Sequence, residues 1–214
     1  MRVLIAGANG RTGRRLIPLL LRNGQTPVAM IRHDSQAKEL EALGAETIVG
    51  DLEYPLDHCV KKADAVIFAA GSGSKTGKDK TILVDQLGAI RLATTAEFAG
   101  VRRFVMISAI GASPSSNHPK IAHYMKAKGH ADDFLRERDL DWTIIKPGPL
   151  SGNPGTGRIS ISQHFGHTGE TSLDNLAQAT CESLSLQNLF QKEFQMLDGD
   201  QPIAEALRAY SPQD

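Results

Sequence analysis

The sequence feature that most constrains the fold is a glycine motif, Gly7-x-x-Gly10-x-x-Gly13, between an apolar run at 2–6 and a helical pattern that begins at Arg11. A strand that enters a glycine-rich turn and continues as a helix presents free backbone N–H groups to a phosphate. Glycine allows the tight turn and the close approach of a ligand, and Asn9 tolerates a positive φ. The spacing differs from the commonest dinucleotide motif, G-x-G-x-x-G. Taken alone, it therefore also fits a turn without a ligand.

The rest of the chain alternates short Val-, Ile- and Ala-rich runs with helical patterns. Strands are expected at 2–6, 27–32, 46–49, 63–69, 103–108 and 141–146. Helices are expected at 11–23, about 34–43, 55–62, 80–100 and 120–138. This alternation predicts an α/β protein with a doubly wound parallel sheet, the Rossmann fold.

After residue 150 the composition changes to a glycine-rich stretch with little periodicity. We expect a loop-rich rim with a short strand at 158–161, then a helix at 172–186, a strand at 194–197 and a final helix from 202. The predicted organisation is one domain over 1–214. Its core is 1–150, and 151–214 form a small annex that borders the substrate and adds the last sheet elements.

Composition limits the functional class. Lys+Arg and Asp+Glu both number 24, so no net charge favours nucleic acid or an anionic membrane as a partner. The chain shows neither a signal-peptide pattern at its start nor an apolar run near the roughly 20 residues of a membrane span. Cys59 and Cys181 lack metal-ligand or redox spacing, so we interpret both as reduced packing residues, with a disulfide left open. We expect a cytoplasmic monomer or homodimer that acts on a small molecule.

The end of the second strand indicates which dinucleotide is bound. In an open parallel sheet, ligands bind beyond the carboxyl ends of the strands, and an arginine after the second strand accommodates a 2′-phosphate. Arg32 and His33 occupy that position, about 20 residues after the glycine motif. The sequence thus favours NADP(H). Because Asp34 lies close by, NAD(H) binding remains an alternative. A further alternative is that Arg32 is a solvated surface residue that contacts no cofactor.

The next two strand ends also suggest cofactor contacts. Asp51 can accept a hydrogen bond from an adenine amino group, and Leu52 can pack on the ring. Small residues after the fourth strand would let the chain pass close to a ribose. The predicted cofactor-binding residues of these four strand ends are Gly7, Asn9, Gly10, Arg11, Thr12, Gly13, Arg32, His33, Asp51, Leu52, Ala69, Ala70 and Gly71.

Three polar residues suggest catalysis. Ser108 ends the fifth strand, and Tyr124 and Lys128 lie four residues apart on one face of the following helix. An ammonium beside a phenol favours the phenolate, which suits the tyrosine to exchange the proton that accompanies hydride transfer. Ser108 could hydrogen-bond the same substrate oxygen. A solvated helix face is the alternative for an isolated Tyr–Lys pair, but here the pair follows a predicted dinucleotide-binding sheet.

The histidines offer a second chemistry. His118, His123 and His130 lie near the predicted catalytic helix, and His164 and His167 lie in the rim. A metal site needs three or four converging ligands, and this pattern lacks them, so no metal is expected. We interpret His123 as a substrate contact or a surface residue.

Several motifs together resemble the short-chain dehydrogenase/reductase superfamily, most closely its atypical NAD(P)-binding branch of epimerase/dehydratase-like proteins. They are Gly7-x-x-Gly10-x-x-Gly13, Asp51-Leu52, Ser108, Tyr124-x-x-x-Lys128 and Pro147-Gly148-Pro149-Leu150. The resemblance covers essentially the whole chain. It implies that Lys128 also hydrogen-bonds the nicotinamide ribose and that Pro147, Gly148, Pro149 and Leu150 flank the nicotinamide. The large substrate domain of the extended epimerases is missing.

These observations predict an oxidoreductase or epimerase/dehydratase-like enzyme that uses NADP(H) on a small carbonyl, alcohol or sugar-like substrate. Tyr124 is the expected acid/base, Lys128 its partner and Ser108 the orienting hydroxyl. The alternative is a non-catalytic NADP(H)-binding protein that senses redox state, because members of the atypical branch include proteins that bind the dinucleotide without turnover.

Overall fold

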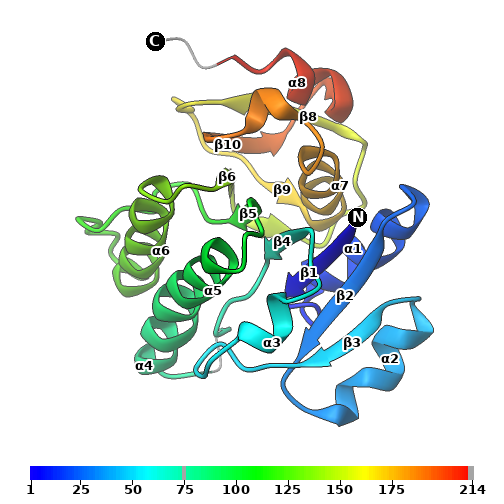
Figure 1. The fold of residues 1–214 in the computed structure, drawn as a ribbon. Coiled ribbons are helices and arrows are strands. Elements are labelled where there is room, and N and C mark those ends of the chain that lie inside the picture. The colour runs from blue at the N-terminus through cyan, green and yellow to red at the C-terminus, as the bar shows by residue number, and fades with distance from the viewer. Residues whose placement is uncertain (74–75, 212–214) are drawn as a thin grey trace.

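The computed structural model describes residues 1–73 and 76–211 (Figure 1). A central sheet has the strand order β11-β8-β10-β6-β5-β4-β1-β2-β3. Its strands are β1 Arg2–Ala6, β2 Thr26–Ile31, β3 Glu46–Val49, β4 Ala65–Phe68, β5 Arg103–Ile107, β6 Asp141–Pro147, β8 Arg158–Ser162, β10 Lys192–Asp198 and β11 Gln201–Pro202. The strands from β3 to β10 pair in parallel, and β8 runs antiparallel to both neighbours. The two-residue strands β7 Leu150–Ser151 and β9 Thr171–Ser172 form a separate parallel pair.

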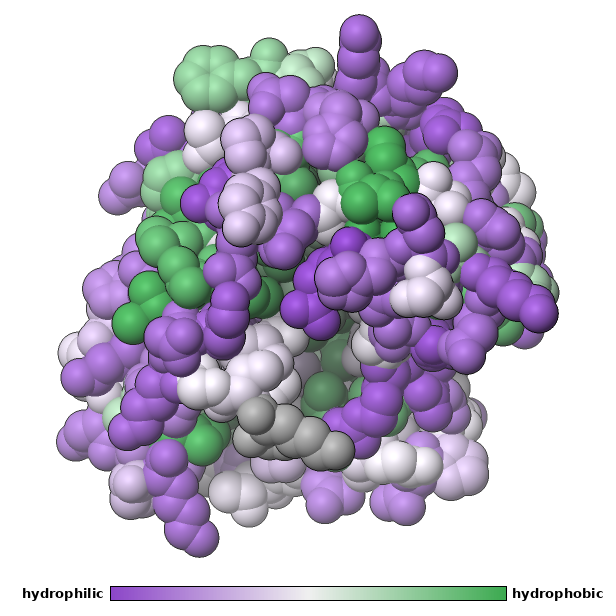
Figure 2. Space-filling view, turned by 90° about the horizontal axis from the view of Figure 1, so that it is seen from below, coloured by the Kyte–Doolittle hydropathy of each residue, from purple (hydrophilic) through white to green (hydrophobic). Residues whose placement is uncertain are grey.

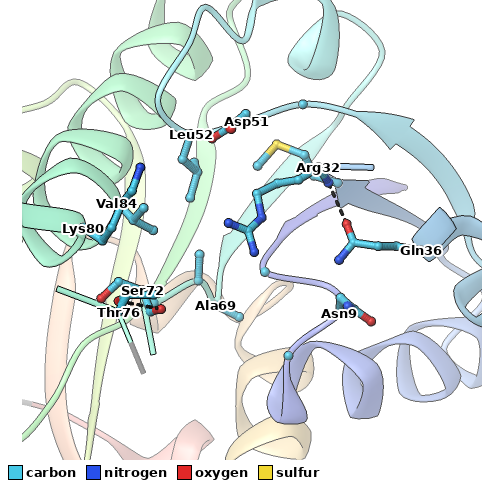
Figure 3. A pocket seen from close by; sticks show the side chains of 16 residues that line it. Asn9, Arg32, Gln36, Asp51, Leu52, Ala69, Ser72, Thr76, Lys80 and Val84 are labelled. Carbon is cyan, nitrogen blue, oxygen red and sulfur yellow. Dashed lines mark hydrogen bonds between the residues drawn. The ribbon is translucent and has the colours of Figure 1, made fainter. Parts of the chain in front are cut away.

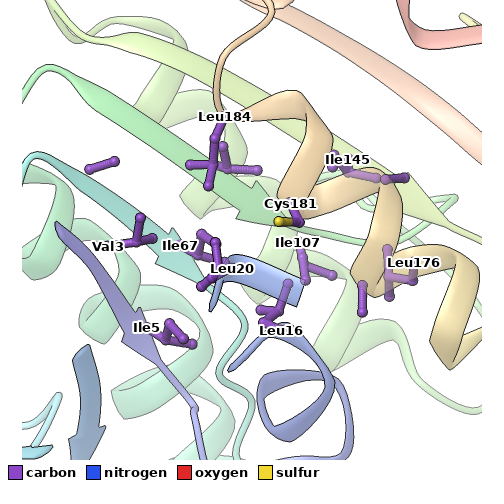
Figure 4. Close-up of a cluster of buried hydrophobic side chains, with 14 of the residues drawn as sticks. Val3, Ile5, Leu16, Leu20, Ile67, Ile107, Ile145, Leu176, Cys181 and Leu184 are labelled. Carbon is purple, nitrogen blue, oxygen red and sulfur yellow. The ribbon is translucent and has the colours of Figure 1, made fainter. Parts of the chain in front are cut away.

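Helices cover both faces of the sheet. They are α1 Arg11–Arg22, α2 Ala37–Ala42, α3 Asp57–Val60, α4 Lys78–Lys80, α5 Leu87–Phe98, α6 Ala122–Arg136, α7 Leu173–Ser183 and α8 Ile203–Ala209. The shorter 3₁₀ segments are η1 Asp34–Gln36 and η3 Gln187–Leu189, and η2 Thr81–Gln86 is a π-helix. The hydrophobic core has two parts, one on each face of the sheet, because successive side chains of a strand point to opposite faces. In the first core, Val3 and Ile5 of β1 pack with α1 and α7. In the second core, Leu4 packs with α3, α5 and α6. Figure 4 shows Leu16 and Leu20 of α1 in the first core beside Leu176 of α7.

This architecture confirms the predicted α/β class and the doubly wound sheet, and the longer predicted strands fall within a few residues of the observed ones. The expected long helix over 80–100 is present as a continuous helical run from α4 through η2 to α5, and the unpredicted feature is the π-helical stretch of η2. Residues after 150 extend the central sheet: β10 pairs with β6, and the fully buried Met196 lies opposite Pro147. The two-residue strands were not predicted, since two residues show no periodicity.

Both cysteines are free and buried, Cys59 on α3 and Cys181 on α7. Burial raises the pKa of each thiol to about 11, as expected for packing residues. In the part of the chain that the structure describes, no helix is long and apolar enough to cross a bilayer.

Candidate functional site

A pocket of about 390 Å³ lies at the carboxyl ends of β1, β2, β3 and β4 (Figure 3). Figure 2 views the molecule from below the orientation of Figure 1 and shows a hollow in this face, with apolar side chains visible inside it. The pocket is lined by Gly7, Asn9, Gly10, Met30, Arg32, Gln36, Gly50, Asp51, Leu52, Ala69, Ala70, Gly71, Ser72, Thr76, Lys80 and Val84. Four strand ends predicted separately to contact a dinucleotide thus meet at one cavity.

The glycine turn brings β1, α1 and the end of β4 into close contact. Gly7 has a φ of +86°, and a Cβ there would lie 2.6 Å from the Cα of Ala70. A Cβ on Gly13 would lie 2.2 Å from the Gly7 carbonyl oxygen, so α1 can start this close to the strand only with glycine. Gly10 precedes α1 without a side-chain cap, and the first turn holds no acidic residue. The start of α1 therefore keeps its attraction for an anion.

The reason given for Asn9 from the sequence is wrong. Among the described non-glycine residues, only Gln191 has a positive φ. Asn9 is instead held by Arg14, whose guanidinium donates to its side-chain oxygen and, over 3.2 Å, to its backbone oxygen. Asn9 lines the pocket, whereas Arg11 is exposed outside it and Thr12 is buried behind the turn.

Arg32 reaches from the end of β2 toward the middle of the pocket (Figure 3). The side-chain oxygen of Gln36 accepts hydrogen bonds from the backbone N–H of Arg32 at 2.8 Å and of His33 at 3.2 Å, which fixes the turn. Within residues 1–73 and 76–211, no carboxylate forms an ion pair with Arg32. His33 is exposed and lies outside the pocket lining.

The opposite wall follows β3. The Asp51 carboxylate accepts a hydrogen bond from the Glu53 N–H at 3.0 Å, and Leu52 is buried. Glu53 pairs with Lys80 over 2.6 Å, which ties this wall to α4. The sequence did not point to the lining residues Met30, Gln36, Gly50, Ser72, Thr76, Lys80 and Val84. Met30 lies in β2, Gln36 in η1, and Gly50 directly after β3. The proximity of Ser72, Thr76, Lys80 and Val84 depends on how the segment after β4 returns over the sheet, and no local pattern encodes that path.

Lys128 of α6 connects the predicted catalytic helix to this pocket. Its ammonium donates to the carbonyl of Ile107 at 3.1 Å and to that of the lining residue Ala70 at 3.4 Å. It also lies 5.9 Å from the centre of the Tyr124 ring. The structure thus brings together Lys128, the half-buried Tyr124 and the pocket wall.

Asp85, on the π-helix η2, completes the surroundings of Lys128. Its carboxylate is fully buried, accepts a hydrogen bond from the Ser72 N–H at 2.9 Å and lies 3.8 Å from the Lys128 ammonium. π-Helical turns occur frequently at functional sites. Sequence reasoning missed Asp85; the available signal was a lone acid within the apolar run after Thr81.

Ser108 lies outside the pocket lining. The residue is only 3% exposed, and its hydroxyl donates to the carboxylate of Asp132 on α6 at 2.7 Å. Burial raises the pKa of Asp132 to about 6, although Lys146 and Ser108 act in the opposite direction. Asp132 was also missed, because acids on helices are usually solvated.

The turn at Pro147–Leu150 packs against the last strands, outside the pocket lining. The Gly148 N–H donates to the carbonyl of Met196 and to the hydroxyl of Thr171, each at 3.1 Å. Leu150 pairs with Thr171 in the small sheet. Among the described residues, no group of three or more His, Cys, Asp or Glu side chains is placed to hold a metal ion.

The sequence model of a protein family described as NAD(P)H-binding matches residues 7–186, from the glycine turn to beyond α7. The chain belongs to this NAD(P)H-binding family. The cofactor is therefore a nicotinamide dinucleotide, and the glycine turn, open at the start of α1, fits its pyrophosphate.

Relatives of this family member cover nearly its whole length. The uncharacterized sugar epimerase YhfK of Bacillus subtilis is 40% identical over 213 residues, 97% of this chain and 99% of that protein. The yeast UPF0659 protein YMR090W, from Saccharomyces cerevisiae, is 30% identical and covers 98% of each chain. A solved structure from Bacillus halodurans, provisionally described as an NAD-dependent epimerase/dehydratase, has 42% identity and a TM-score of 0.95, and covers 98% of this chain and 100% of that one.

Proposed function

We propose that the chain is an NADP(H)-preferring oxidoreductase or epimerase/dehydratase-like enzyme of the atypical short-chain dehydrogenase/reductase branch. Its substrate is a small carbonyl, alcohol or sugar-like molecule. The observation that carries the cofactor preference is the Arg32 side chain, which enters the pocket without a carboxylate partner among the described residues. An unpaired guanidinium at the end of β2 suits a 2′-phosphate, whereas NAD-binding sites commonly place an acid there.

In this proposal, residues within and beyond the pocket lining bind different parts of the cofactor. The start of α1, with Gly7, Gly10 and Gly13, holds the pyrophosphate. Asp51 and Leu52 contact the adenine. The remaining proposed contacts are Asn9, Arg11, Thr12, His33, Ala69, Ala70, Gly71, Lys128, Pro147, Gly148, Pro149 and Leu150.

When bound, the cofactor would supply or accept a hydride, and side chains of the protein would transfer the accompanying proton. Tyr124 gives or takes the proton at the substrate oxygen, and the ammonium of Lys128, 5.9 Å from its ring, stabilises the phenolate. Ser108 completes the proposed set. The name of the Bacillus subtilis relative, a sugar epimerase, supports a hydroxyl-bearing substrate.

Calorimetric titration with each cofactor tests the preference. NADPH should bind at least about tenfold more tightly than NADH, a difference of about 1.4 kcal/mol. Arg32→Ala should remove this difference, and Arg22→Ala, a matched control at an exposed arginine of α1 outside the pocket lining, should retain it. Equal affinities of the native protein for both cofactors would contradict the proposal. A screen of carbonyl substrates for NADPH oxidation then tests catalysis.

A second candidate function, a non-catalytic NADP(H) sensor, is favoured by one observation. The Ser108 hydroxyl donates to Asp132, so its proton is not offered to a substrate. Tight NADPH binding without turnover across the carbonyl screen would support the sensor.

A further inference from the structure

The bond between Ser108 and Asp132 links the end of β5 to α6. The hydroxyl and the carboxylate oxygen are 2.7 Å apart, and both residues are buried. The second carboxylate oxygen of Asp132 accepts no hydrogen bond within the described residues. A buried carboxylate that lacks hydrogen-bond donors is unfavourable, so the Asp132 carboxylate depends strongly on the hydrogen bond from the Ser108 hydroxyl.

The charged groups that act on the Asp132 carboxylate are basic. The ammonium of Lys146 on β6 lies 3.7 Å from the Asp132 carboxylate. The same ammonium forms an ion pair with Glu193 of β10 at 3.1 Å. Lys128 and Arg136, one turn before and one turn after on α6, also favour the charged form. Burial outweighs them and raises the pKa to about 6, so Asp132 changes protonation state within the range in which enzymes work.

We propose that Asp132 is a positioning residue that sets the direction in which the Ser108 hydroxyl donates. As a carboxylate, Asp132 accepts the hydroxyl proton, and Ser108 can offer only lone pairs to a substrate. As a carboxylic acid, with a proton taken from solvent, Asp132 donates to the Ser108 oxygen. The hydroxyl then turns and donates to a substrate carbonyl.

This inference rests on the proposed function, because it assigns Ser108 a substrate oxygen. It has a directional consequence. Protonated Asp132 assists reduction, in which the substrate carbonyl needs a donor. Ionised Asp132 assists oxidation, in which the substrate hydroxyl needs an acceptor. The pH dependences of the two directions therefore oppose each other in the native protein.

The first test needs no substrate. Carboxyl ¹³C NMR of the full chain, labelled at aspartate, should show one resonance that is lost in Asp132→Asn and titrates near pH 6. Ser108→Ala removes a bond to the carboxylate and should move this titration to higher pH. Asp133→Asn, at an exposed neighbour on α6, is the matched control and should leave it in place. An Asp132 titration unchanged by Ser108→Ala would overturn the inference.

The second test uses turnover of a carbonyl substrate found in the screen. The native kcat/KM for reduction should fall as pH rises through about 6, and the fall should be absent in Ser108→Ala and Asp132→Asn. At pH 5.5 Ser108→Ala should lose about tenfold in kcat/KM, the effect of one hydrogen bond. A native pH profile retained in Ser108→Ala overturns the positioning role. Absence of turnover in the native protein instead contradicts the proposed function, and the NMR titration then decides the Ser108–Asp132 coupling alone.

Discussion

The carboxylate of Asp85 lies 3.8 Å from the ammonium of Lys128, and the two residues reach each other from η2 and α6. Neither side chain is more than 3% exposed. Asp85 also accepts the Ser72 N–H, and Lys128 donates to Ala70, so this pair encloses the backbone of the pocket wall. The Asp85–Lys128 pair therefore connects α6 to the backbone that lines the cofactor pocket.

Replacing one member of this pair should destabilise the protein strongly. Asp85→Asn leaves the Lys128 ammonium buried without its opposite charge, which costs about 3 kcal/mol or more in the free energy of unfolding. Lys128→Met should cost a similar amount, and the double variant less than the sum, because no charge is then left unpaired. Urea denaturation of the four proteins measures this coupling.

The matched control is Thr81→Val, which changes another buried polar residue of η2, in hydrogen-bonding distance of the Ser72 hydroxyl at 3.3 Å. It should cost about 1 kcal/mol and add independently to Lys128→Met. Strictly additive effects of the Asp85 and Lys128 substitutions would mean that their charges do not interact.

A methyl group at Gly13 should disrupt the glycine turn. Its Cβ would lie 2.2 Å from the Gly7 carbonyl, and backbone must shift to make room. We expect Gly13→Ala to lower the free energy of unfolding by about 1–3 kcal/mol and to weaken NADPH binding, which calorimetry measures. Gly24→Ala, at a positive φ with no atom within 4 Å of the added Cβ, controls for conformational strain alone. NADPH affinity that is equal in both variants would argue against the turn as the pyrophosphate site.

Asp132 should make stability depend on pH. Its pKa rises from 3.8 to about 6 on folding, so between these values the native state binds more protons than the unfolded state. This contribution is present below about pH 4 and is lost as pH rises to about 6. Urea denaturation from pH 4 to pH 7 should therefore show the native protein losing stability relative to Asp132→Asn. A constant difference across this range would show that Asp132 is not perturbed.

The sequence predicted those features that depend on local pattern. Apolar runs located the strands, and the glycine spacing located the turn beneath the pocket, because both are properties of consecutive residues. Arg32 was found because its place after β2 follows from topology. Asp85 was not, since a π-helix shifts register by an amount that the apolar pattern does not record. Ser108 was found at its strand end, but the direction of its hydroxyl depends on Asp132, which lies 24 residues away.

Tyr124→Phe tests the proposed chemistry most directly. The substitution removes only the hydroxyl and keeps the aromatic ring, so NADPH affinity should stay nearly unchanged. Turnover of any substrate found should fall by about 10²–10⁴-fold, the usual contribution of a positioned acid/base. Calorimetry and NADPH oxidation measure the two effects on the same preparation.

His123→Asn, at the neighbouring position on α6, is the control and should retain turnover. The reverse result, with activity retained in Tyr124→Phe and lost in His123→Asn, would transfer the proton step to the histidine.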